Sequence, residues 1–292
     1  MAFLNNGAMM SVRSQGTAMP APTRRQDRPL ALVTGASSGI GAAFARALAA
    51  QDHDLALVAR RADRLEQLSG ELSAAHGVEA FAIPCDLSLL GAHQTVLDAV
   101  AARGREVAML VNNAGFSIAQ SFAATPWRQQ QDFLMTVVVN ACGLAHGVLP
   151  AMTARGAGRI INIASLAGFA PGVAGHSLYP GAKGLMIKFS QALDAECRAQ
   201  GIKVTAVCPG FTQTEFAAAN GTAAVMDEAP RRLFQTAAQV AEAALAANAR
   251  GQVVVVPGWH NLVAATLLQY MPQGLVRAVL MKGSAKYHLA AE

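Results

Sequence analysis

Short apolar runs alternate with segments of helical periodicity along most of the chain. The runs are continuously apolar, which is typical of strands that are buried on both faces of a parallel sheet. They cover residues 30–35, 54–60, 78–87, 107–115, 158–165, 203–210 and 252–257. Seven such strands with helices between them predict an α/β fold: a doubly wound, Rossmann-like parallel sheet with helices on both faces, in a single domain.

The segments between the runs have the apolar spacing of helices. They cover residues 39–51, 62–76, 88–104, 126–155, 179–200 and 236–249. Glycines stand where four of these helices should stop and the next strand resumes, at Gly77, Gly104, Gly156 and Gly201. Glycine is the residue most often found just past a helix end, so these positions support the predicted order of elements.

The alternation predicts a folded domain at residues 30–258. Three regions of the chain, one of them inside this domain, do not follow it. Residues 1–29 mix polar residues, Pro and Gly without periodicity and predict a mobile tail. Residues 211–235 are long for a connection between a strand and a helix, which favours a functional lid. Residues 259–292 predict an apolar helical extension, which we expect to serve as a dimer contact or a pocket wall rather than as a peripheral membrane contact.

Composition narrows the possible classes of function. Apolar residues make up 53% and charged residues 14%, which supports a large core and excludes global disorder. Arg13, Arg24, Arg25 and Arg28 against Asp27 place +3 of the formal charge of +5 in residues 1–29, leaving +2 elsewhere. No cationic stripe with interleaved aromatic residues follows, so nucleic-acid binding has little support.

The four cysteines predict neither a metal site nor a disulfide framework. They are scattered in apolar or helical surroundings and form no CxxC pair or metal-ligand spacing with histidine. We therefore expect buried free thiols in a reducing, cytoplasmic location. The start of the chain also lacks the pattern of a secretory signal, and no run of about 18 uncharged apolar residues predicts a transmembrane helix.

A glycine-rich turn, TGASSGIG at Thr34–Gly41, follows the first predicted strand and opens the first helix. Gly35 permits the turn, whereas Gly39 and Gly41 allow the backbone to approach a pyrophosphate at the positive end of the helix. Ser37, Ser38 and Ile40 complete the predicted contact segment. A purely structural turn remains the alternative when the glycines are considered alone.

Arginines at the end of the second strand indicate which nucleotide this turn binds. Sites for NAD usually place Asp or Glu there to hold the ribose hydroxyls, but this chain has Arg60 and Arg61, with Arg64 one turn later. Guanidinium groups match a 2′-phosphate, so the cofactor predicted is NADP(H). The alternative, a solvated basic helix start, is disfavoured because helix N-termini repel cations.

Polar and small residues follow two further strands, at the edge where open α/β sheets bind ligands. Asp86, with Leu87 beside it, is placed to hold the adenine amino group. Asn113, Ala114 and Gly115 offer a small-residue turn against the nucleotide. Each of these segments is also common in turns that bind nothing.

Tyr179 and Lys183 carry the candidate chemistry. Residues four apart share one helix face, so the ammonium group of Lys183 is expected to lower the phenol pKa of Tyr179 below its ordinary value. Such a tyrosine can act as an acid or base near neutral pH. Ser165 lies 14 residues earlier, and Pro180 predicts that the helix begins at about Tyr179. An isolated pair of this kind is usually an ordinary helical pair.

Taken together, these motifs resemble the short-chain dehydrogenase/reductase superfamily in order and spacing, over about residues 30–258. The run LVARR before RL resembles an NADP-preferring branch of it. The resemblance implies that Tyr179 is the general acid/base, that Lys183 binds the nicotinamide ribose, and that Ser165 holds the substrate oxygen. It also implies that Asn140 holds a water in a proton relay. The residues implied near the nicotinamide are Pro209, Gly210, Thr212 and Thr214.

The implied protein is an NADP(H)-dependent oxidoreductase acting on an apolar ketone, an aldehyde or a secondary alcohol. Its domain is then the catalytic domain at 30–258, with 211–235 as a substrate lid. Members of the family commonly form homodimers or homotetramers. A catalytically idle nucleotide-binding or scaffold protein on the same fold is the alternative, because a fold does not guarantee catalysis.

Overall fold

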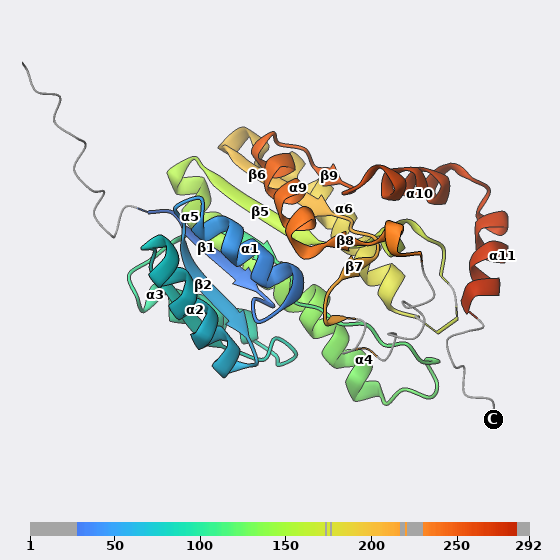
Figure 1. The fold of residues 1–292 in the computed structure, drawn as a ribbon, viewed down its shortest axis with the longest axis horizontal. Helices are drawn as coiled ribbons and strands as arrows, with labels where there is room; N and C mark the ends of the chain where they lie inside the picture. Colours follow the sequence, from blue (N-terminus) through green and yellow to red (C-terminus); the bar gives the residue numbers. More distant parts are fainter. Residues whose placement is uncertain (1–27, 173, 176, 217–219, 221–229, 285–292) are drawn as a thin grey trace, which may run out of the picture.

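A seven-stranded parallel sheet forms the centre of the molecule (Figure 1). The structure is a computed structural model that describes residues 28–172, 174, 175, 177–216, 220 and 230–284. The strands are β1 (Leu30–Thr34), β2 (Asp54–Ala59), β3 (Ala80–Pro84), β4 (Val107–Asn112), β5 (Gly158–Ile163), β6 (Ile202–Val207) and β9 (Val254–Val255). Their order is β3-β2-β1-β4-β5-β6-β9, and all neighbours pair in parallel. The predicted α/β fold is confirmed.

Helices cover both faces of this sheet. They are α1 (Gly39–Ala49), α2 (Ala62–His76), α3 (Ala92–Ala101), α4 (Trp127–Leu134), α5 (Asn140–Arg155), α6 (Tyr179–Cys197) and α9 (Ala237–Ala249). One core layer contains Ala31 and Val33 of β1 with side chains of α1, α2 and α9. The other contains Leu30 and Leu32 with side chains of α3, α5 and α6. Alternate residues of one strand thus enter opposite layers, which explains the continuous apolar runs.

Element boundaries differ from the sequence prediction at several elements, three of which illustrate the pattern. The run predicted as a strand at 252–257 pairs only over Val254–Val255, and the strand expected at 78–87 is confined to Ala80–Pro84. The helix expected at 88–104 begins only at Ala92, because Gly91 before it has a left-handed backbone. Long-range pairing decides the two strand ends, and it leaves little trace in local periodicity.

The helix predicted over 126–155 is interrupted. A π-helical turn, Met135–Val139, separates α4 from α5, and the backbone N–H of Asn140 bonds to the carbonyl of Met135. Taken together, α4, the π-helical turn and α5 span 29 residues, Trp127–Arg155, and are long and apolar enough to cross a membrane by length and composition alone. Here it packs on the sheet through buried Leu144, Val148 and Met152 of α5, as a core helix does.

A small second sheet joins the two ends of the predicted lid. Strand β7 (Thr212–Gln213) pairs in parallel with β8 (Gln235–Thr236), and Thr236 then caps α9. Within the segment 211–235, residues 217–219 and 221–229 lie outside the described residues. The same holds for residues 1–27 of the predicted tail and 285–292 of the predicted extension. The described part of that extension forms α10 (Trp259–Tyr270) and α11 (Gln273–Ser284).

Candidate active site

The glycine turn is held against the end of β4. Thr34 Oγ1 accepts hydrogen bonds from the backbone N–H groups of Asn113 (2.9 Å) and Ala114 (3.0 Å), and Asn113 Nδ2 donates to the carbonyl of Thr34 at 2.9 Å. Gly35 has φ of +66°, and a Cβ there would lie 2.7 Å from Asn113 Nδ2. A Cβ on Gly41 would overlap the carbonyl oxygen of Gly35. The structure therefore brings both predicted nucleotide segments together and requires glycine in the turn.

The N-terminus of α1 suits a phosphate. Ser38 is the N-cap residue, but its side chain makes no capping hydrogen bond, and the first turn contains no acidic residue. Backbone N–H groups in a first helical turn have no partner within the helix, so an uncapped, acid-free turn favours a bound anion. A dinucleotide pyrophosphate fits this position.

Arg61 links the end of β2 to the same turn. Its guanidinium donates to Ser37 Oγ at 3.0 Å and to Ser38 Oγ at 2.8 Å. Arg64 lies one turn along α2, while Arg60 is exposed and forms no ion pair with the described part of the chain. We call Arg61 and Arg64 with Ser37 and Ser38 the arginine site. Its donors fit a 2′-phosphate, which carries three acceptor oxygens.

An acidic residue missed in the sequence completes this arrangement. Glu215 forms ion pairs with Arg61 (3.0 Å) and Arg64 (2.7 Å). Hydrogen bonds from Arg64 and Arg61 lower the pKa of its carboxyl group, so it is an anion at neutral pH. The adjacent Thr214 lies against the glycine turn, since a Cβ on Gly39 would lie 3.1 Å from Thr214 Cβ. The start of the segment 211–235 therefore contacts the predicted cofactor site.

Other predicted cofactor residues lie at the same edge of the sheet. Asp86 Oδ1 accepts from the backbone N–H of Ser88 at 3.0 Å, and Leu87 is buried in the core. The carbonyl of Pro209 accepts from Leu166, while Thr212 Oγ1 donates to the carbonyl of Gly210 at 3.1 Å. These are turn-stabilising contacts, and binding of adenine or nicotinamide by these residues stays a prediction.

Lys183 is buried beside the nucleotide segments. The residue is 5% exposed, and its Nζ donates to the carbonyl of Ile163 at 2.8 Å. A Cβ on Gly115 would lie 3.8 Å from this Nζ, which places the amine next to the turn after β4. Burial lowers the pKa of Lys183 to about 8. The amine is therefore largely protonated at neutral pH and loses its proton just above it.

Tyr179 is the first residue of α6, as Pro180 after it predicted. The predicted lowering of its phenol pKa is wrong for this structure. Burial raises the phenol pKa, and a hydrogen bond to Ser165 only partly opposes this. Lys183 Nζ lies 5.8 Å from the centre of the tyrosine ring and donates to Ile163 instead. Desolvation of the phenolate therefore sets the direction of the shift.

Ser165 both caps a helix and contacts the tyrosine. Its Oγ accepts from the backbone N–H of Ala167 at 3.1 Å, at the start of a short 3₁₀ helix, Leu166–Phe169. The same side chain hydrogen-bonds to Tyr179. The capping bond fixes the rotamer of Ser165, so its hydroxyl is held at the phenol.

Asn140 is buried, and its side chain is engaged away from Lys183. Its Nδ2 donates to the carbonyls of Leu87 (2.8 Å) and Leu89 (2.9 Å), and its Oδ1 accepts from the backbone N–H of His93. The His93 ring also contacts Oδ1, at 2.8 Å, and lies where a Cβ on Gly143 would be. A water relay at Asn140 would therefore have to use its backbone carbonyl and stays a prediction. His93, which the sequence analysis missed, positions this side chain.

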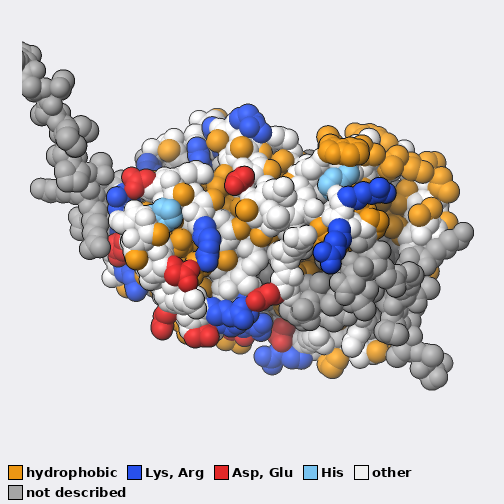
Figure 2. Space-filling model, in the orientation of Figure 1, with side chains coloured by type: hydrophobic (Ala, Val, Ile, Leu, Met, Phe, Trp, Pro, Cys, Tyr) orange, Lys and Arg blue, Asp and Glu red, His pale blue; other side chains and the backbone are white. Residues whose placement is uncertain are grey.

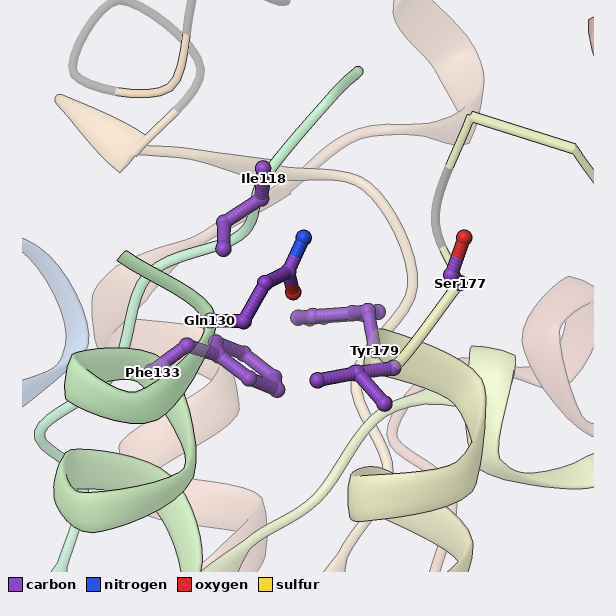
Figure 3. Close-up of a pocket in the computed structure, with 6 residues that line it drawn as sticks. Ile118, Gln130, Phe133, Ser177 and Tyr179 are labelled. Carbon is purple, nitrogen blue, oxygen red and sulfur yellow. The ribbon is translucent and has the colours of Figure 1, made fainter. Parts of the chain in front are cut away.

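A small pocket opens beside Tyr179 (Figure 3). Gln130 and Phe133 of α4 face Tyr179 across it, and Ile118 closes another side. The rings of Phe133 and Phe216 lie 6.2 and 6.5 Å from the tyrosine ring. The lining therefore combines apolar side chains with the hydroxyl of Ser177 and the amide of Gln130. Gln130 is buried, and periodicity could not distinguish it from a core position.

The family model for short chain dehydrogenases matches residues 29–225. The chain belongs to the short-chain dehydrogenase/reductase family. The Rossmann-like sheet and the nicotinamide-dependent oxidoreductase class follow from this membership. Among the residues that the structure describes, no group of three His, Cys, Asp or Glu side chains is placed to hold a metal.

Individual relatives include a reductase and two dehydrogenases. The ketoacyl reductase HetN of Nostoc sp. is 36% identical over 184 residues, which is 62% of this chain and 62% of that protein. A short-chain dehydrogenase from Sphingobium yanoikuyae, solved in complex with NADPH, is 34% identical with a TM-score of 0.73, covering 85% of this chain and 94% of its own. The bulky-bulky ketone specific alcohol dehydrogenase from Comamonas testosteroni is 30% identical with a TM-score of 0.70, covering 85% and 93%.

Proposed function

We propose that the protein is an NADP(H)-dependent carbonyl reductase that acts on apolar ketones or aldehydes and also runs the reverse oxidation of secondary alcohols. The observation that carries this proposal is the convergence of Tyr179, Ser165 and Lys183 beside the turn at Gly115. Bound NADPH supplies the hydride. The protein then has to orient the carbonyl and provide its proton.

Each of the three side chains has a defined task in this scheme. Tyr179 is protonated at neutral pH, so its hydroxyl can donate a proton to the carbonyl oxygen. Ser165, held by its capping bond, donates to the same oxygen and orients it. The ammonium group of Lys183, 5.8 Å from the centre of the tyrosine ring, attracts the phenolate that remains after the proton has left.

The arginine site supports NADP(H) over NAD(H). Arg61 already lies between the glycine turn and α2, and Ser37 and Ser38 point hydroxyls at it. A 2′-phosphate there would meet guanidinium and hydroxyl donors at once, whereas an NAD ribose would lack a carboxylate that is not already paired. The Sphingobium relative was solved with NADPH, which agrees with this preference.

Side chains around Tyr179 support an apolar substrate that also carries a polar substituent. Phe133, Phe216 and Ile118 provide aromatic and aliphatic surface near the proton donor. The amide of Gln130 faces the same space and offers a hydrogen bond to a second polar group of the substrate. The Comamonas relative is described as specific for bulky ketones, which is consistent with this class.

A carbonyl panel tests the proposal. The purified protein is assayed for oxidation of NADPH and, separately, of NADH, with aliphatic, aromatic and keto-ester substrates. We expect turnover of bulky apolar ketones, with kcat/KM at least tenfold higher for NADPH than for NADH. Tight binding of NADPH without turnover on any substrate would instead support the idle nucleotide-binding alternative.

A further inference from the structure

Glu215 occupies the anion position of the arginine site. Its carboxylate oxygens lie 3.0 Å from Arg61 Nη1 and 2.7 Å from Arg64 Nη1. Arg61 at the same time donates to Ser37 and Ser38 in the glycine turn. One carboxylate therefore holds two of the three cations, Arg61 and Arg64 but not Arg60, that the sequence assigns to a 2′-phosphate.

These ion pairs contribute little to the stability of the fold. The side chain of Glu215 is 52% exposed, and those of Arg61 and Arg64 are 40% and 44% exposed. Exposed pairs of this kind are weak because water screens them. An incoming phosphate could therefore displace the carboxylate without disturbing the core.

The contact of Glu215 with the two arginines lies within the cofactor site. Glu215 directly follows Thr214, which lies against Gly39 at the N-terminus of α1. Arg61 is itself the N-cap of α2, where the helix dipole disfavours a cation, so an anion at this point relieves that repulsion. A carboxylate and a 2′-phosphate would satisfy the same donors, and both anions cannot occupy them fully at once.

We propose that Glu215 is a specificity-determining residue that competes with the 2′-phosphate of NADP(H) for Arg61 and Arg64. Binding of the phosphate moves the carboxylate off the arginines, so each NADP(H) molecule binds against this competition and NAD(H) does not. Glu215 thus reduces the preference for NADP(H) over NAD(H) that the arginines create. The inference rests on the proposed NADP(H) specificity, but it assigns a residue that this proposal does not need.

The test compares binding of NADPH and NADH by titration calorimetry, without any substrate. Glu215→Gln removes the charge and keeps the size of the side chain, so we expect NADPH to bind about threefold to tenfold more tightly. Binding of NADH should change less than about twofold. Glu71→Gln, which breaks the exposed pair with Arg46 on α1 and α2, is the matched control and should change neither.

The variant Arg61→Ala tests the proposed NADP(H) specificity separately from the competition by Glu215. If this variant binds NADPH more weakly and NADH as before, the arginine site binds the 2′-phosphate as proposed. The result for Glu215→Gln then tests the competition alone. Unchanged or weaker binding of NADPH by Glu215→Gln would overturn the inference. Weaker binding of NADH by the same variant would overturn it too, because Glu215 would then be a ribose ligand. An Arg61→Ala variant with unchanged NADPH binding would refute the NADP(H) specificity itself.

Discussion

Burial opposes the charged form of both Tyr179 and Lys183. It raises the pKa of the phenol and lowers that of the amine to about 8. At neutral pH this leaves a neutral proton donor beside an ammonium group, which is the arrangement that carbonyl reduction needs. In the reverse direction, Tyr179 would have to lose its proton before it could accept the proton of an alcohol.

The pH dependence of reduction should follow Lys183. As pH rises through about 8, Lys183 becomes neutral and no longer stabilises the phenolate, whereas Tyr179 stays protonated. We therefore expect kcat/KM for NADPH oxidation to fall above that pH, since this ratio reports groups of the free enzyme. A profile that stays level up to 10.5, the ordinary pKa of lysine, would show that the amine charge has no role.

Side chains paired through local spacing could be predicted from the sequence, and those paired through the fold could not. Tyr179 and Lys183 share a helix face, so their proximity follows from four residues of separation. Glu215 lies 151 residues from Arg64, and Asn140 lies 47 residues from His93. No periodicity reports such contacts, which explains why Glu215 and His93 were missed.

Among the elements, the turn between β1 and α1 tolerates little change. The sequence predicted it correctly because each glycine answers a steric need that the flanking strand and helix create. The helix at 126–155 was predicted as one piece, because a π-helical turn hardly alters apolar spacing. That turn directly precedes Asn140. The interruption that the sequence did not predict therefore lies beside a candidate catalytic residue.

Gly41→Ala should disrupt the turn and abolish cofactor binding. Its Cβ would overlap the carbonyl oxygen of Gly35 and lie 2.6 Å from Asn113 Nδ2, so the backbone must move. We expect a loss of about 2 kcal/mol or more in the free energy of unfolding. Gly70→Ala in α2 is the control, because nothing lies within 4 Å of its Cβ and alanine favours the helix by about 1 kcal/mol. Equal stability of the two variants in urea unfolding would contradict the steric account.

At the scale of the whole molecule, apolar side chains gather on α10 and α11 (Figure 2). Trp259, Leu262, Val263, Leu267 and Tyr270 are all exposed on α10, and Leu275 and Val279 continue the surface on α11. We call these seven side chains the apolar surface. Contiguous apolar surfaces of this kind usually mark an interaction site. The homodimer or homotetramer, like the cytoplasmic location, stays a prediction.

The apolar surface should mediate self-association. We expect Leu262→Ser combined with Leu267→Ser to lower the molar mass measured by light scattering on a sizing column, while Leu90→Ser, at an exposed leucine near α3, leaves it unchanged. An unaltered oligomer would assign assembly to another face. Loss of co-sedimentation with lipid vesicles in the double variant would indicate a membrane contact instead.

The role of Tyr179 as proton donor is the central claim, and Tyr179→Phe tests it most directly. The measurement is kcat for NADPH oxidation with the best ketone of the panel, alongside Tyr270→Phe as a control at an exposed tyrosine of α10. Removing the only transferable proton of the side chain should lower kcat by about a hundredfold or more while NADPH still binds. Turnover by Tyr179→Phe equal to that of the Tyr270→Phe control would contradict the assigned mechanism.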